Sequence, residues 1–357
     1  MAENKTTILV EMLHGIGDTV CALPSLDLLR EKFQNARIDV MVKFDTCKDI
    51  VEASHIYVDN IIVINIYDRI IDDIRLIKKL RENEYDYLIV NCATSVNKAR
   101  LFAKIIRPKK WLGIQQNGYF LDNNPADKHF VELNLEAIKQ ICDIPHKYIY
   151  PKLYFESDNY NKISSLCENN EHYKKDRITI GICIGNADPS YRYRFFHLGR
   201  VYTRGWGIDN MINLLNKLSK EDFNIILIGG VQEKELLEVI RHKKCNVGID
   251  FVGKTSIKGS IALLAHCDLV IGVDTGMQHV AAAVGSSTLS IFGPTNPKSH
   301  GALSEKAYFI QSAQPCQYCY GTEKYINCDD RKCLKSITVD MVINMVHLIL
   351  QNRKGRL

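Results

Sequence analysis

The sequence predicts an α/β protein with two domains, each built on a parallel sheet that has helices on both faces. Apolar strand-like segments alternate with amphipathic helical segments through both halves of the chain, and this alternation is typical of parallel sheets covered by helices. The length of 357 residues exceeds what one hydrophobic core usually organises. A polar and charged segment at 156–176 marks the expected boundary between the domains.

The first half, residues 1–165, is predicted to be the N-terminal domain. Short apolar runs predict strands, and apolar residues at helical spacing predict helices. The expected strands are Thr7–Glu11, Ile38–Val42, Ile61–Ile64 and Tyr87–Asn91. The expected helices are Ser25–Phe33, Arg69–Leu80 and Lys98–Ile106.

The second half, residues 166–335, is predicted to have the same architecture without a sequence repeat of fixed period. Its expected strands are Ile178–Cys183, Ile225–Gly229, Phe251–Val252, Leu269–Val273 and Thr288–Phe292. The amphipathic pattern of Val339–Leu350 predicts a final helix. We expect residues 336–357 to return to the N-terminal domain, as terminal helices of such folds usually do.

Composition limits the classes of protein to consider. A hydrophobic fraction of 46% is ordinary for a globular chain, and no run approaches the roughly 20 apolar residues of a membrane span. The first residues lead into a strand instead of a signal peptide, so we expect a cytoplasmic protein whose 12 cysteines are reduced thiols. The formal charge of +5, without any nucleic-acid-binding motif, argues against a nucleic-acid partner.

The stretch 268–295 gives the clearest indication of a ligand site. An apolar strand ends in Asp274-Thr275-Gly276, an alanine-rich helix follows, and a second strand leads to Gly293-Pro294-Thr295. Asp274 and Thr275 are expected to cap the helix, and Gly276 lets a ligand approach the backbone. The amides and positive dipole end of the helix then favour an anion.

A second candidate segment, Gly15-Ile16-Gly17-Asp18-Thr19-Val20, follows the first strand and leads into an apolar helix that contains Leu23-Pro24. Gly15 and Gly17 are expected to relax the backbone geometry of this loop. Val20 stands where a dinucleotide fingerprint has its third glycine, so an NAD-dependent dehydrogenase is disfavoured. In a parallel sheet this loop lies at the carboxyl edge, where ligands bind.

Together the two segments resemble glycosyltransferase family 9, the heptosyltransferases. That family opens with Gly-Ile-Gly-Asp before Leu-Pro, and its donor-binding signature is Asp-Thr-Gly, a histidine and an alanine run before a Phe-Gly-Pro-Thr strand end. The resemblance implies the GT-B fold, in which two doubly wound Rossmann-like domains face each other across a cleft. It also implies inverting, metal-independent transfer from a nucleotide sugar. No Asp-X-Asp follows an apolar strand, so we expect no cofactor for catalysis.

Asp18 is predicted to be the catalytic base. Transfer requires a group that takes the proton of the acceptor hydroxyl, and the resemblance puts the family's catalytic aspartate at Asp18. The spacing alone leaves a second interpretation open, in which Asp18 only caps the following helix.

The donor contacts follow from the same resemblance. It assigns donor binding to Asp274, Thr275, Gly276, Met277 and His279, with the glycines Gly15 and Gly17. For Met277, helix packing is the plainer explanation. His279 lies on the same helical face as Thr275, but a lone histidine at such a position is often only packed.

Arg204 is predicted to bind the departing phosphate and so to support catalysis. It stands two residues before Trp206, where the family commonly has a lysine that contacts the donor phosphates. Arginine binds phosphate bidentately, so the charge is kept and the reach changes. The alternative is a solvated arginine ahead of a helix that Trp206 staples. Three more arginines, Arg192, Arg194 and Arg200, make this stretch basic.

A cysteine cluster in the tail is a separate motif. Cys316, Cys319, Cys328 and Cys333 are spaced as Cys-X2-Cys-X8-Cys-X4-Cys, and four thiolates at such spacing favour a structural zinc or iron site. The family resemblance adds that its branch acting on autotransporter adhesins has an iron-bound cysteine motif. Free surface thiols in an irregular loop are the alternative.

The basic, partly apolar stretch 97–111 has two interpretations. Such a helix can touch an anionic membrane surface or a phosphorylated lipid, which would make the enzyme peripheral at the inner membrane. More often the pattern belongs to a helix that packs on a sheet and has a solvated basic rim.

The sequence therefore predicts an inverting glycosyltransferase that moves a heptose from an ADP-activated donor to a lipopolysaccharide-core sugar. An alternative acceptor is a protein hydroxyl of an autotransporter adhesin. A sugar-nucleotide epimerase of related fold is the alternative from another enzyme class, and a metal-stapled binding module with a vestigial donor pocket is the non-catalytic one.

Overall fold

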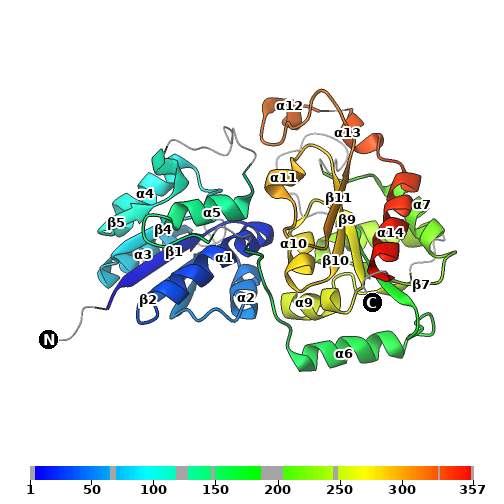
Figure 1. Cartoon of the computed structure of the whole chain (residues 1–357), viewed down its shortest axis with the longest axis horizontal. Helices are drawn as coiled ribbons and strands as arrows, with labels where there is room; N and C mark the ends of the chain where they lie inside the picture. The colour runs from blue at the N-terminus through cyan, green and yellow to red at the C-terminus, as the bar shows by residue number, and fades with distance from the viewer. Residues whose placement is uncertain are drawn as a thin grey trace. The chain divides into compact units, whose positions relative to one another are not determined.

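The computed structural model describes residues 5–64, 70–117, 128–145, 149–185, 204–243, 248–328 and 330–354. The chain divides into two compact units, unit 1 (residues 1–154) and unit 2 (residues 155–357), coloured from blue to green and from green to red in Figure 1. The division falls before the predicted boundary at 165, because helix α6 (Ser157–Glu168) packs against α9 (Ile257–Ala265) within unit 2.

The sheet of unit 1 is parallel, as predicted. Its strands lie in the order β3 (Asn60–Val63), β2 (Arg37–Val42), β1 (Thr7–Met12), β4 (Tyr87–Val90) and β5 (Lys110–Leu112). The edge strand β5 was not expected from the sequence. The strand order reverses between β1 and β4, and in open parallel sheets ligands bind at the carboxyl ends of the strands beside such a switch point.

Helices cover both faces of this sheet. On one face lie α1 (Ile16–Lys32), α2 (Asp45–Ala53) and α5 (Phe130–Ile138), and on the other lie α3 (Ile70–Leu80) and α4 (Val96–Ile106). Two short 3-10 helices, η1 (Arg81–Asn83) and η2 (Ile114–Asn117), complete the described elements of unit 1. Each face of the sheet thus has its own buried apolar cluster.

Helix α1 begins nine residues before the predicted start at Ser25, at Ile16. Gly15 is the N-cap, and the Thr19 hydroxyl donates to its carbonyl oxygen at 3.0 Å. Pro24 lies inside the helix, where it cannot donate a backbone hydrogen bond. The helix continues past it because Ala22, Leu26 and Leu29 recur at helical spacing and are buried against the sheet.

The basic segment α4 is a sheet-packing helix. Its side chains Ala99, Phe102 and Ile106 are buried in the unit 1 core, whereas Leu101 is exposed. This arrangement agrees with the interpretation in which a packed helix has a solvated basic rim. Across the described part of the chain, every helix is too short or too polar to span a bilayer.

The sheet of unit 2 repeats the same plan with one more strand. Its order is β11 (Ala307–Gln311), β10 (Ser287–Phe292), β9 (Leu269–Val273), β6 (Ile178–Cys183), β7 (Phe223–Ile228) and β8 (Ile249–Asp250), all parallel. The order reverses between β6 and β9. Strands β6 and β9 have the predicted bounds, and β11 is a further edge strand that the sequence did not predict.

The helices of unit 2 also lie on both faces. Helices α7 (Ile208–Leu218), α8 (Lys234–His242) and α14 (Val339–Lys354) enclose one buried cluster, and α6, α9 and α10 (Gly276–Ala283) lie on the other face (Figure 1). Shorter elements are η5 (Val231–Glu233), α11 (Pro297–His300), α12 (Glu323–Ile326) and α13 (Lys332–Lys335).

The position of α14 differs from the expected return to the N-terminal domain. Its apolar residues Val342, Val346 and Ile349 are buried in the core of unit 2, and the helix packs against α7. The physical reason is that α7 presents Leu214 and Leu218 to the same cluster, and these side chains need an apolar cover.

Candidate functional site

In unit 2, the structure brings together two of the residues that the sequence assigned to the donor. Asp274 directly follows β9, and its side chain is only 8% exposed. It accepts a hydrogen bond of 2.7 Å from the hydroxyl of Thr295, which follows β10, and it forms an ion pair with Arg204 across 3.3 Å. Both partners bind the same oxygen, Oδ2. Asp274 is therefore fixed at the carboxyl edge of the sheet, beside its switch point.

The predicted capping of α10 is only partly right. Thr275 is the N-cap residue, but its side chain makes no capping hydrogen bond, and its Oγ1 is buried without a partner. The Asp274 carboxylate does not cap the helix either, because its hydrogen bonds go to Arg204 and Thr295. Neither Thr275 nor Asp274 therefore caps the first amides of α10 with its side chain, and these amides point their partial positive charge at the loop.

The other predicted donor residues lie on the first two turns of α10. Gly276 and Met277 are half-buried, and His279 is 9% exposed. Between them Gln278 is buried, accepts from the Ser290 hydroxyl at 3.2 Å, and has an amide nitrogen without a partner. Gly276 and Met277 are thus the accessible part of this segment, and His279 is mainly packed.

Trp206 anchors the segment that carries Arg204. Its side chain is 4% exposed, and its indole N–H donates to the backbone oxygen of Ile337 at 2.8 Å. Gly207 has φ of 102°, a conformation that favours glycine, and it turns the chain into α7. The three other arginines predicted to make this stretch basic, Arg192, Arg194 and Arg200, lie outside the described residues.

Tyr320 is a neighbour of Arg204 that the sequence did not predict. The guanidinium carbon of Arg204 lies 5.3 Å from the centre of the Tyr320 ring, within the range of a cation–π contact. The Tyr320 ring itself contacts His300 and Tyr325 edge-on, and its backbone N–H donates to the Pro294 oxygen. A tail residue thus helps to orient the predicted phosphate-binding arginine.

The four tail cysteines do not form the predicted metal site as they lie. In the described residues, no three side chains of His, Cys, Asp or Glu are arranged to hold a metal ion. Cys316 is exposed and Cys333 is buried in the unit 2 core, so their thiols face different surroundings. Burial raises the pKa of Cys333, and the thiols of Cys319, Cys316 and Cys328 raise it further. The four groups are therefore neighbours without a common centre.

In unit 1, Asp18 lies in the first turn of α1, at the carboxyl end of β1. Its Oδ2 accepts the backbone N–H of Gly15 at 3.2 Å, which is half of a capping box. The other oxygen, Oδ1, has no partner among the described residues and is not buried. The capping role that the sequence left open for Asp18 is therefore present, and it uses one of the two carboxylate oxygens, Oδ2.

The glycines of this segment do not relax the backbone as predicted. Gly15 has φ of −78° and ψ of 178°, an extended conformation open to any residue, and Gly17 is part of α1. A Cβ atom at Gly15 would lie 3.5 Å from Oδ2 of Asp18, an ordinary contact. Neither glycine belongs to those with positive φ.

A buried polar network beside Asp18 was not predicted. Glu11, in β1, is 1% exposed and accepts the Thr94 hydroxyl at 2.7 Å. Thr94 in turn lies 2.7 Å from Nε2 of His14. Burial raises the pKa of the Cys92 thiol, and the charges of Asp18 and Glu11 raise it further, so both carboxylates lie close to Cys92. The network links residues about 80 positions apart, which a sequence pattern does not reveal.

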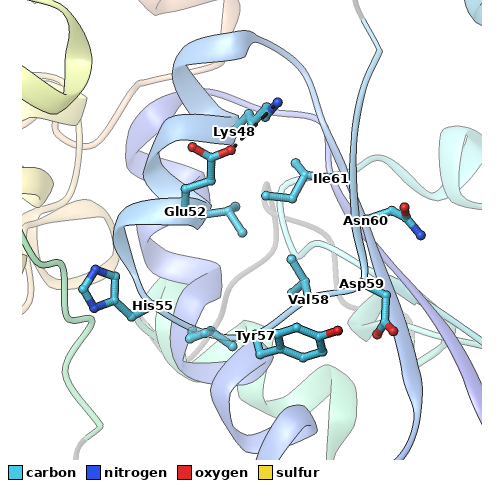
Figure 2. A pocket seen from close by; sticks show the side chains of 10 residues that line it. Lys48, Glu52, His55, Tyr57, Val58, Asp59, Asn60 and Ile61 are labelled. Atoms are coloured by element: carbon cyan, nitrogen blue, oxygen red, sulfur yellow. Dashed lines mark ion pairs between the residues drawn. The ribbon is translucent and has the colours of Figure 1, made fainter.

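A separate hollow lies between α2 and β3 (Figure 2). It has a volume of about 540 Å³, and half of its lining residues come from the connection between α2 and β3, residues 55–59. Lys48 and Glu52 form an ion pair at 3.8 Å on one side, and Asp59 on the other is paired with Arg30 at 3.1 Å. This connection lies where β3 begins, at the amino edge of the sheet, away from the strand ends that carry Asp18 and Glu11. We therefore do not assign it to the site.

Residues 74–328 match the family model described as glycosyltransferase family 9 (heptosyltransferase). Lipooligosaccharide heptosyltransferase 2 of Haemophilus influenzae is 28% identical over 255 residues, which cover 66% of this chain and 68% of the relative.

Solved structures show the same fold. The chain is similar to a family 9 glycosyl transferase from Veillonella parvula, with a TM-score of 0.80, 17% identity and 99% of both chains covered. It is also similar to the ADP-heptose LPS heptosyltransferase II of E. coli, with a TM-score of 0.72, 22% identity, and 98% of this chain and 100% of the other covered. These matches confirm the predicted GT-B-like fold, with its two parallel α/β sheets.

Proposed function

Since this chain belongs to glycosyltransferase family 9, the heptosyltransferases, we propose that it transfers a heptose from an ADP-activated donor to a sugar of the lipopolysaccharide core. The observation that carries the proposal is the ion pair of Arg204 and Asp274 beside the uncapped start of α10. The names of the relatives, a lipooligosaccharide heptosyltransferase and an ADP-heptose LPS heptosyltransferase, support the choice of donor and acceptor.

The donor diphosphate is assigned to the start of α10. A phosphate there meets backbone amides that the N-cap side chain of Thr275 does not cap, together with the positive end of the helix dipole. Arg204 adds a cation, and its side chain is 18% exposed, so it is not sealed off. Arg204 keeps its guanidinium between Asp274 and the Tyr320 ring, and a phosphate oxygen competes with Asp274 for it. Asp274 in turn is assigned the role of accepting hydrogen bonds from the hydroxyls of the donor sugar.

Asp18 is assigned the role of base. Its Oδ1 has no partner among the described residues, while Oδ2 stays bound to the Gly15 N–H. In the proposed reaction the acceptor hydroxyl gives its proton to Asp18 and its oxygen forms a bond to the anomeric carbon. The bond from that carbon to the diphosphate breaks, and ADP leaves with the electron pair. Arg204 and the α10 amides stabilise the charge that develops on the departing phosphate.

The acceptor and the cellular setting belong to the same proposal. A lipopolysaccharide-core acceptor is anionic and lipid-linked, so the basic rim of α4 is assigned a peripheral contact with the inner membrane. The proposed location is cytoplasmic, where the 12 cysteines would stay reduced.

We also propose that the four tail thiols bind a structural metal ion. Four soft donors suit zinc or iron, and burial together with the neighbouring thiols of Cys316 and Cys328 raises the pKa of Cys319. The thiols do not converge as they lie, so a bound ion has to draw the loop around Cys316 and Cys319 toward Cys333. No step of the transfer depends on it.

The proposal is tested by mass spectrometry of the purified full chain with a panel of nucleotide sugars and acceptors. The panel contains ADP-heptose and UDP-glucose as donors, and heptose-deficient lipopolysaccharide and an autotransporter adhesin as acceptors. A mass increase of one heptose on the lipopolysaccharide is the expected result. Heptose on the adhesin alone would move the chain to the protein acceptor, and isomerised donor without transfer would favour an epimerase.

A further inference from the structure

The network around Glu11 fixes the hydrogen-bond role of Thr94. Glu11 accepts the backbone N–H of Leu13 at 2.9 Å on Oε1 and that of Asn91 at 3.2 Å on Oε2. Its Oε2 also accepts from Thr94 Oγ1 at 2.7 Å. A threonine hydroxyl has one proton to donate, and here that proton points to Glu11. Toward any other neighbour Thr94 is therefore only an acceptor.

This role determines which ring nitrogen of His14 carries the proton. Nε2 of His14 lies 2.7 Å from Thr94 Oγ1. Because Thr94 has already given its proton to Glu11, Nε2 must be the donor in this contact, and a neutral His14 then has its lone pair on Nδ1. The chain Glu11–Thr94–His14 thus selects one tautomer, as a carboxylate does when it orients a histidine through a hydrogen bond.

Nδ1 of His14 is an open acceptor. It has no hydrogen-bond partner among the described residues, the His14 side chain is half-buried, and Nδ1 is not a buried atom. The His14 carbonyl oxygen accepts the Cys47 thiol at 3.6 Å, which holds the backbone from α2. His14 is followed directly by Gly15, whose N–H binds Asp18. Two open acceptors, His14 Nδ1 and Asp18 Oδ1, therefore lie on one short segment at the β1–β4 switch point.

The charge of this edge favours hydroxyl groups over phosphates. Within the described ranges, neither Glu11 nor Asp18 forms an ion pair with a lysine or arginine. An anion would be repelled by two carboxylates, whereas a sugar hydroxyl donates to an open acceptor. The same edge has a buried amide nitrogen, Nδ2 of Asn91, without a partner, so the polar groups here are not all satisfied within the protein.

We infer that His14 is a second contact for the acceptor sugar, with Nδ1 accepting a hydrogen bond from a hydroxyl near the one that Asp18 deprotonates. Glu11 and Thr94 are positioning residues that hold the single ring proton of a neutral His14 on Nε2. This inference rests on the proposed function, since it needs a polyhydroxylated acceptor bound at unit 1. It adds a residue to acceptor recognition that neither the glycine segment nor the family resemblance indicated.

The first test needs no substrate. Long-range ¹H–¹⁵N NMR of the ¹⁵N-histidine-labelled full chain reports the tautomer of His14, whose signals are assigned by their loss in His14→Phe. We expect the Nε2–H tautomer in the wild type and in Thr94→Ser, and a mixture in Thr94→Val, which removes the hydroxyl at nearly constant volume. An Nδ1–H tautomer in the wild type would overturn the inference, whatever the reaction proves to be.

The second test measures transfer to heptose-deficient lipopolysaccharide, or to whichever acceptor of the panel receives the sugar. His14→Phe should raise the KM for the acceptor about 3- to 10-fold, the effect of one lost hydrogen bond, and leave the affinity for ADP unchanged. Thr94→Val should raise the same KM less, and Thr94→Ser should restore it. Unchanged KM in His14→Phe would refute the contact. A wild type that transfers nothing refutes the proposed function instead, and the tautomer result remains valid.

Discussion

The switch points of the two sheets hold a buried acid in different ways. In unit 1, Glu11 is satisfied by two backbone amides and a hydroxyl. In unit 2, Asp274 is satisfied by a hydroxyl and by the cation of Arg204. The donors to Glu11 are neutral, so its negative charge is not cancelled by a cation. The acceptors beside Glu11, His14 Nδ1 and Asp18 Oδ1, have no partner among the described residues. An ion pair places a positive charge at the second edge, where a phosphate can compete for it.

The difference shows how one topology can serve the two chemical tasks of the proposed reaction. Both sheets are parallel and reverse their order beside their first strand, so both present a helix start and a polar turn at the carboxyl edge. An edge with unpaired carboxylates suits proton acceptance from a hydroxyl, and an edge with a cation and uncapped amides suits a diphosphate. In the proposed reaction, the division of labour between the two edges therefore depends on a few side chains and not on the fold.

The largest effect is expected at the acidic edge. Asp18→Asn keeps the shape of the side chain and an oxygen for the Gly15 N–H, but it cannot take a proton. Turnover should fall by about 10²–10⁴-fold, with donor affinity by calorimetry and thermal stability close to wild type. A variant that transfers sugar at a near wild-type rate would leave Asp18 with its capping role alone and remove the contrast between the two edges.

The next effect concerns the cation of unit 2. Arg204→Ala should lower transition-state stabilisation by about 2–4 kcal/mol, because the charge on the departing phosphate loses its partner. The measurement is kcat/KM together with ADP affinity. Arg204→Lys is the matched control, since it keeps the charge without the bidentate geometry, and it should recover part of the loss. Equal activity of the wild type and Arg204→Ala would mean that another group binds the phosphate.

A smaller effect tests how Arg204 is oriented. Tyr320→Ala removes the ring that faces the guanidinium, and an exposed cation–π contact contributes about 0.5–1 kcal/mol. ADP should bind roughly 2- to 5-fold more weakly. Tyr320→Phe keeps the ring and should bind ADP like the wild type. If Tyr320→Phe is as weak as Tyr320→Ala, the hydroxyl acts on the ligand directly and the ring contact is not the cause.

The smallest effect on transfer is expected from the tail cysteines. The proposed metal predicts near-stoichiometric zinc or iron by elemental analysis, lost in the Cys316→Ser/Cys319→Ser double variant. Because a site with four protein ligands has no open position, thermal stability should fall more than turnover. Metal-free protein with four freely titrating thiols and unchanged stability would contradict the proposal.

Local patterns were enough to predict the α/β architecture, and with the family resemblance they named candidate residues in each unit. Strands β6 and β9 have their predicted bounds, because buried strands of a parallel sheet are continuous apolar runs. The edge strands β5 and β11 were missed, since short, half-exposed segments lack such a run. The start of α1 was missed because Gly17 and Pro24, which usually interrupt helices, lie within it.

Asp18, Arg204 and Asp274 could be named as candidates from the sequence, because the local turns and the family resemblance together pointed to them. Their contacts could not. The sequence did not indicate that Arg204 faces Asp274 and Tyr320, or that Glu11 reaches His14 through Thr94. Hydrophobic periodicity specifies which segments become strands and helices. The order of the strands in the sheet decides which distant side chains meet at its edge, and that order follows from packing of the whole unit.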